Sequence, residues 1–271
     1  MLEVPARSPG LSTQHSWWGR VGGENGGVVR TALAATSTLV AMAFALSTFE
    51  RWVDRRRPHE LAWTASLAAF TLASGAQWAG AAAGWGGPTF RVFYLFGPIV
   101  SVPALALGTV YLLGGPQLGH RTAMALAAIG AFAAGVLVAA PLTGPIEPDT
   151  LPQGSDVFGA LPRILAGVCS GVAALVVVGG AVWSGVRLAR RRASRRLAAA
   201  NALVALGTLL LSAGGALNSV FDAMTSFAVT HAVGITVVFV GFLVSNPPRR
   251  AVTPLRRIDV DLTDRNEARA G

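Results

Sequence analysis

The sequence predicts an all-α membrane protein, built as a bundle of seven transmembrane helices with its N-terminus outside and its C-terminus cytoplasmic. Hydrophobic residues make up 52% of the 271 residues and charged residues only 13%, a balance typical of integral membrane proteins. Seven apolar segments are each close to the roughly 20 residues that a helix needs to cross a hydrocarbon core. Arginines gather in alternate connections between these segments, which indicates an orientation.

The seven segments set the domain organisation. Residues 1–27 mix proline, glycine, serine and single charges, which predicts a flexible extracytoplasmic tail. Residues 28–245 form the transmembrane domain, and residues 246–271 form a charged cytoplasmic tail. The proline-rich connection near 141–162 carries three acids and is expected to be an aqueous loop. The segments themselves cover about 28–49, 61–85, 91–114, 121–141, 161–187, 197–219 and 226–245.

Arginine placement predicts the orientation. All 22 basic residues are arginines, and all but five lie in the first, third and fifth connections or in the C-terminal tail. Positively charged loops stay on the cytoplasmic side, so these connections are expected to be cytoplasmic. The plasma membrane is the expected location. The five arginines left for the other side are Arg7, Arg20, Arg30, Arg91 and Arg163.

Several function classes are disfavoured by composition. Without lysine the chain cannot form the Schiff base of a retinal protein. The four histidines fall on a tail, two loops and one helix end, and there is a single cysteine, so we expect no metal, haem or other cofactor. No acid lies near the middle of a segment, which disfavours ion-coupled transport. The arginines flank apolar segments, so no nucleic acid partner is expected, and no catalytic pair is evident.

Polar residues near the predicted outer ends of several segments suggest a ligand pocket. An ionised group near a membrane normally finds an opposite charge, and the acid at 222 is a plausible partner for Arg91 or Arg30. The alternatives are that the residues at 91 and 94 are interfacial anchors and that those at 222 and 231 are wetted helix ends that never meet. The candidate pocket residues are Gln77, Arg91, Tyr94, Asn218, Asp222 and His231.

Two prolines in the third segment, Pro98 and Pro103, predict kinks, because proline lacks an amide hydrogen and clashes with the preceding turn. The carbonyl groups released in this way need partners in lipid, and Ser101 is one candidate. A kinked helix can open a cavity, or it can merely bend.

The predicted inner surface carries its strongest charge in the fifth connection. Each arginine near an anionic membrane surface contributes about 1 kcal/mol, so the cluster is a candidate contact for anionic lipid or for a membrane or cytoplasmic protein partner. The alternative is that it only sets the orientation. Its members are Arg190, Arg191, Arg192, Arg195 and Arg196.

The stretch RVFYLFGPIVSVPALALGTVYLLGG, taken with RRRPHELAW upstream, resembles a family of uncharacterised seven-helix integral membrane proteins of actinobacteria. The similarity covers the first three or four segments best. It implies the seven-helix topology and carries no activity, cofactor or catalytic residue.

The function favoured by the sequence is not enzymatic. We expect a membrane module that binds or senses a small ligand, with a lipid as one candidate, from the outer side and presents an arginine-rich inner face. The first alternative is a facilitative transporter of a small neutral solute, and the second is a structural or accessory subunit of a membrane complex. Uptake by sealed vesicles and co-purification with another protein would distinguish them.

Overall fold

The structure is a computed structural model that describes residues 12–190, 196, 199–200, 202–211 and 224–245. Side chains are described for residues 27–187, 196, 199–200, 202–211 and 228–244. Asn218, Asp222, Arg191, Arg192 and Arg195 therefore lie outside the described residues, and the side chain of Arg190 does too.

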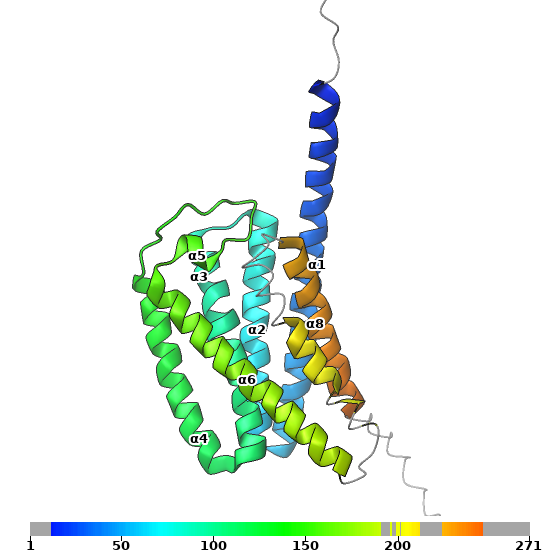
Figure 1. Cartoon of the computed structure of the whole chain (residues 1–271), viewed down its shortest axis with the longest axis vertical. Helices are drawn as coiled ribbons and strands as arrows, with labels where there is room; N and C mark the ends of the chain where they lie inside the picture. The colour runs from blue at the N-terminus through cyan, green and yellow to red at the C-terminus, as the bar shows by residue number, and fades with distance from the viewer. Residues whose placement is uncertain (1–11, 191–195, 197–198, 201, 212–223, 246–271) are drawn as a thin grey trace, which may run out of the picture.

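The described chain is helical throughout its regular structure and contains no β-strand (Figure 1). Each of the seven predicted segments contains a helix, so the all-α, seven-helix prediction is confirmed at that level. The helices are α1 (Ser12–Arg55), α2 (Pro58–Ala83), α3 (Gly87–Tyr94), the π-helix η1 (Leu95–Ser101), α4 (Val102–Ala139), α5 (Gly154–Val157), α6 (Ala160–Arg190), an apolar helix at Ala202–Leu211 and α8 (Met224–Ser245).

Within the described residues, three helical stretches are long and apolar enough to cross a membrane, namely Gly27–Arg55, Gly87–Ala139 and Ala160–Arg187. Two shorter apolar helices, Ala202–Leu211 and Ala228–Val244, accompany them. The stretch Gly87–Ala139 contains the predicted third and fourth segments. These lengths support a membrane protein.

Large apolar side chains on the outside of the bundle agree with this assignment. Val138 is 79% exposed, Leu175 75% and Met124 67%, whereas Ser66 and Ser74 are buried. A water-soluble protein rarely leaves so much apolar surface uncovered. A surface of this kind suits contact with lipid tails.

Gly115 separates the third and fourth segments. Its φ of 81° and ψ of 175° are not helical, and this left-handed region favours glycine. Pro116 follows and also disfavours a helical residue before it. The chain reverses at this point, which brings Ile99 into one buried cluster with Ala133 and Leu137 of the second half of α4.

Successive segments consequently run in opposite directions, and the bundle has two distinct ends. We call the end that carries Trp85, the start of α3 and the loop 140–159 the capped end. We call the other end, which carries the end of α1, the start of α2 and the Gly115 turn, the arginine end.

The two prolines of the predicted third segment lie in different kinds of helix. Pro98 lies inside the π-helix η1, whose wider turn accommodates a missing amide hydrogen. Pro103 is near the first residue of α4, and Ser101 and Val102 before it have helical dihedral angles, so no break occurs there. Ser66 Oγ of α2 donates a hydrogen bond of 2.8 Å to the Ser101 carbonyl oxygen, which gives this segment a partner from a neighbouring helix.

Glycines let the helix at Ala202–Leu211 and α8 approach closely. A Cβ at Gly207 would meet the Gly234 carbonyl oxygen at 2.8 Å and the Val238 amide nitrogen at 2.8 Å. Close packing through small residues is expected between membrane helices. At Gly167 and Gly171, where the four-residue spacing suggests the same use, a Cβ would meet no atom within 4 Å.

Helix α1 begins at Ser12, so residues 12–27, which composition assigns to a tail, are helical and continuous with the first segment. No proline interrupts the chain from Ser12 to Arg55, so nothing forces the helix to begin later. The helix projects well beyond the other helices at the capped end (Figure 1).

Candidate functional site

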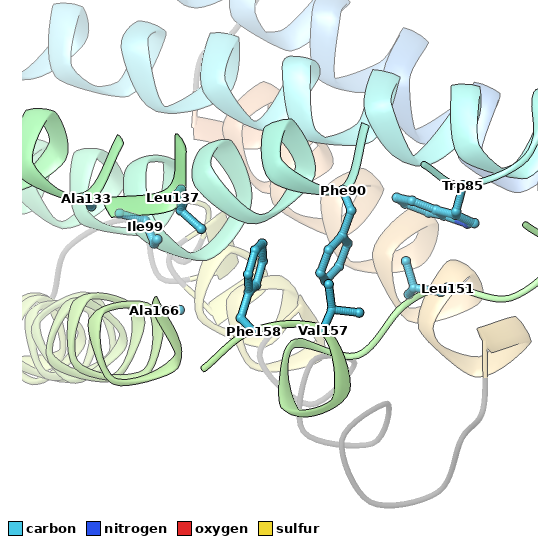
Figure 2. Packing of buried hydrophobic residues seen from close by; sticks show 9 residues of the cluster. All are labelled: Trp85, Phe90, Ile99, Ala133, Leu137, Leu151, Val157, Phe158 and Ala166. Atoms are coloured by element: carbon cyan, nitrogen blue, oxygen red, sulfur yellow. The ribbon is translucent and has the colours of Figure 1, made fainter. Parts of the chain in front are cut away.

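Aromatic side chains fill the capped end of the bundle. Trp85 meets Phe93 edge to face at 5.6 Å between ring centroids, Phe90 stacks on Phe158 at 5.3 Å, and Tyr94 lies 5.1 Å from Phe158. We call these five residues the aromatic cluster. Figure 2 shows Phe90 and Phe158 side by side, with Trp85 beyond Phe90. Each such pair contributes about 0.5–1.5 kcal/mol beyond the area it buries, so the cluster fixes α3 against the loop that follows α4.

That loop, residues 140–159, is an ordered cover. Leu151, Val157 and Phe158 are at most 5% exposed, and the Pro148 carbonyl oxygen accepts a 2.9 Å hydrogen bond from the Trp85 amide. The acids Glu147, Asp149 and Asp156 remain exposed. The exposure of the acids is compatible with an aqueous loop, while the apolar residues between them form part of the core.

Arg91 caps a helix end. Its Nη2 donates to the Ala140 carbonyl oxygen at 2.8 Å, and its Nη1 donates to the Val138 carbonyl oxygen at 3.2 Å. The last carbonyl groups of a helix have no partner within the helix, and a cation there is also favoured by the helix dipole. Arg91 additionally lies over the Phe158 ring at 5.9 Å, so it holds α4 and the cover loop together.

Two buried polar atoms, one in the second half of α2 and one directly after it, have no hydrogen-bond partner among the described residues. They are Gln77 Oε1 and Trp85 Nε1, and both residues are 4% exposed. The Trp85 ring packs on Gly80, which is one helical turn beyond Gln77 on α2. An unmatched buried polar group costs about 1–3 kcal/mol, and native proteins rarely leave one in place without a purpose.

His231 of α8 lies against the face of α2 that carries Gln77, further from the capped end. Its ring stacks on Phe70 at 5.7 Å with an interplanar angle of 11°. Phe70 and Gln77 are seven residues apart, which places them on one helix face about 10 Å apart along the axis. The predicted pocket thus divides into two groups: Arg91 and Tyr94 meet at Phe158, whereas His231 packs on Phe70, on the face of α2 that carries Gln77.

Arg196, a predicted contact for lipid or a partner, caps another helix. Its Nε donates to the Val244 carbonyl oxygen at 2.6 Å, in the last turn of α8. The other four arginines of that predicted contact cannot be placed from the described side chains.

A second polar cluster lies at the arginine end, where α1 meets α2. Glu60 is 1% exposed, and its Oε1 accepts from Arg51 Nη2 at 3.2 Å and lies 3.9 Å from Arg55 Nη1. Arg51 also lies over the Phe242 ring of α8 at 4.7 Å. The three residues Arg51, Arg55 and Glu60, which we call the ion-pair cluster, tie α1, α2 and α8 together. Glu60 also sits in the first turn of α2, where the helix dipole favours a negative charge.

His59 lies beside this cluster, in the first turn of α2. Burial lowers the pKa of His59 below its usual 6.5; Glu60 opposes the change, while Arg57 and Arg51 add to it. Its ring contacts Trp63 edge to face at 5.2 Å.

The mixed charges of ERWVDRRRPHE predict local ion pairs, and the Arg51–Glu60 pair is one of them. Sequence reasoning missed the burial of Glu60 and the role of Trp85. The four-residue spacing of Arg51 and Arg55 puts both side chains on one helix face. This spacing is a sequence signal for the ion-pair cluster. The run from Phe90 to Tyr94 signals an aromatic face. No sequence pattern shows that Phe158 and Trp85 meet it.

No protein-family model matches the chain, and comparison with curated proteins found no match. The resemblance to actinobacterial seven-helix proteins therefore remains a prediction. Function must be inferred from the geometry.

Proposed function

We propose that the protein is a multi-pass protein of the plasma membrane that binds a small, mostly apolar ligand at its capped end without transforming it. The ligand carries a hydroxyl group or an equivalent that can both donate and accept a hydrogen bond. The capped end faces outside, and the arginine end faces the cytoplasm and a membrane or protein partner.

The observation that carries the proposal is the pair of unmatched atoms, Gln77 Oε1 and Trp85 Nε1. The first accepts a hydrogen bond and the second donates one. In the proposed complex one ligand hydroxyl group pairs with both atoms, which converts two desolvation costs into two hydrogen bonds. The surrounding rings would contact the apolar part of the same ligand.

The cover loop supports binding from the capped end. It contacts Trp85 through the Pro148 carbonyl oxygen and contributes Phe158 to the aromatic cluster. It has few hydrogen bonds to the helices, and loops of this kind commonly open to admit ligands. Release of the Trp85 amide from Pro148 would be the first step of such an opening.

The proposed orientation in the membrane rests on the distribution of arginines along the sequence. The first, third and fifth connections and the C-terminal tail hold all but five of the arginines, which favours a cytoplasmic arginine end. The acids Glu147, Asp149 and Asp156 on the cover loop are then outside. Cysteine labelling from either side of intact cells, at Ser155→Cys and Gln117→Cys, tests this orientation.

A facilitative transporter is the second candidate, favoured by the π-helix η1, since such turns are frequent at functional sites. Sealed vesicles that take up a solute in proportion to protein content would support it. A ligand that binds without crossing the vesicle membrane would support the binding module.

Native mass spectrometry of gently purified protein tests the proposed function. We expect a stoichiometric small-molecule adduct that Gln77→Leu removes, whereas Gln117→Leu, the same change at an exposed position, retains it. Trp85→Phe should weaken binding, and Trp78→Phe, which alters a side chain that is 45% exposed, should not. Wild-type protein without any adduct, or an adduct unaffected by Gln77→Leu, would contradict the proposal.

A further inference from the structure

An apolar groove runs between α4 and α6 near the arginine end. Its volume is about 460 Å³, within the range of small-molecule sites. One wall comes from α4 on both sides of the Gly115 turn, and the other comes from α6. The lining residues are Thr109, Val110, Leu113, Gly114, Leu118, Val176, Gly179, Gly180 and Trp183.

The groove opens toward the surface that would face lipid. Trp183 is 64% exposed, Leu118 51% and Leu113 45%, so its rim is apolar and uncovered. Its floor is closed, because a Cβ at Gly180 would meet Thr109 and Leu113. At Gly179 a Cβ would meet no atom within 4 Å, so space remains beside that residue.

Positive charge lies at one end of the groove. Arg187 follows Trp183 by four residues and therefore lies on the same face of α6, one turn closer to the arginine end. Its side chain is exposed, and it makes no ion pair among the described residues. The sequence continues with Arg190, Arg191 and Arg192. An apolar groove with an interfacial tryptophan and a cationic end complements a molecule with an acyl chain and an anionic head.

We propose that this groove binds an anionic phospholipid, with one acyl chain between α4 and α6 and the phosphate-containing headgroup at Arg187. This site is separate from Gln77 and Trp85. A lipid held here would link α6 to the Gly115 turn.

The test uses full-length protein in detergent, exchanged into phosphatidylglycerol or phosphatidylcholine before native mass spectrometry. We expect retention of one phosphatidylglycerol and no retention of phosphatidylcholine. Gly179→Leu fills the groove without an internal clash and should abolish retention, whereas Gly171→Leu, at an equally open position on the same helix, should leave it unchanged. Arg187→Gln should weaken retention about fivefold, the share of one arginine near an anionic surface, and Arg163→Gln should not.

Equal retention of the two lipids would overturn the proposal, because it would indicate an unselective lipid contact. Unchanged retention in Gly179→Leu would overturn it as well, and so would a dimer or another protein occupying the groove. None of these results depends on the outer ligand, since Gln77→Leu leaves the α4–α6 groove intact.

Discussion

The ion-pair cluster gives the sharpest stability prediction. Arg51→Met keeps an apolar stem that can pack near Phe242 but removes the guanidinium group 3.2 Å from Glu60 Oε1. The carboxylate is left 2% exposed, with Arg55 at 3.9 Å as its remaining partner. We expect Arg51→Met to lower the free energy of unfolding markedly.

The size of the expected loss in the free energy of unfolding follows from the burial of the ion pair. Removing one partner of a buried pair costs about 3–5 kcal/mol. The Arg51 side chain is 23% exposed and Arg55 remains close, so the lower value, about 3 kcal/mol, applies here. Glu60→Gln should cost less, about 1–2 kcal/mol, because the two arginines can reach solvent. The double variant Arg51→Met with Glu60→Leu should return to within about 1 kcal/mol of wild type, since neither charge remains buried alone.

Unfolding by sodium dodecyl sulfate in mixed micelles, followed by circular dichroism, measures these differences. Arg57→Met is the matched control, because Arg57 belongs to the same connection, is exposed and forms no ion pair within the described part of the chain. If Arg51→Met unfolds like Arg57→Met, or if the double variant loses the sum of the two single effects, the ion-pair cluster does not stabilise the bundle as argued.

Three further predictions concern other parts of the bundle. The lowered pKa of His59 means that the unfolded chain binds a proton at this residue more readily than the folded chain, so its contribution to stability is present above about pH 6.5 and falls as the pH decreases. His59→Gln should flatten that part of the pH profile of unfolding. An unchanged profile would contradict the lowered pKa of His59. Gly207→Ala should destabilise the protein by about 1–3 kcal/mol because the added Cβ meets backbone atoms of α8. At Gly130 a Cβ meets open space, so Gly130→Ala should be neutral or slightly stabilising in thermal unfolding. Arg91→Met should cost about 1–3 kcal/mol and speed hydrogen exchange at the amides of Ala140, Leu142 and Thr143, which directly follow α4. Unchanged exchange there would argue against the cap.

Sequence patterns were sufficient for the helices because a membrane span has a simple requirement of length and apolarity. The break at Gly115 was predictable from the Gly-Gly-Pro run, and Pro98 does fall in an altered helix. The first helix begins earlier than predicted because poor helix formers such as Gly22 and Gly23 weaken a helix without ending it.

The site was harder to predict because a polar residue's position along the sequence does not determine which side of a helix it faces. Arg91 and Gln77 were expected in one pocket, yet Arg91 turns toward the carbonyl groups of α4 while Gln77 lies on the face of α2 that carries Phe70. The burial of Trp85 depends on the cover loop folding back through Pro148, a long-range contact that composition cannot show.

An experimental density map of the full chain in lipid, at a resolution that shows side chains and waters, tests the central claim most directly. We predict density larger than a water molecule between Gln77 Oε1 and Trp85 Nε1, continuous with an apolar body against the aromatic cluster. A single ordered water between the two atoms, or a protein group paired with both of them, would contradict the ligand site.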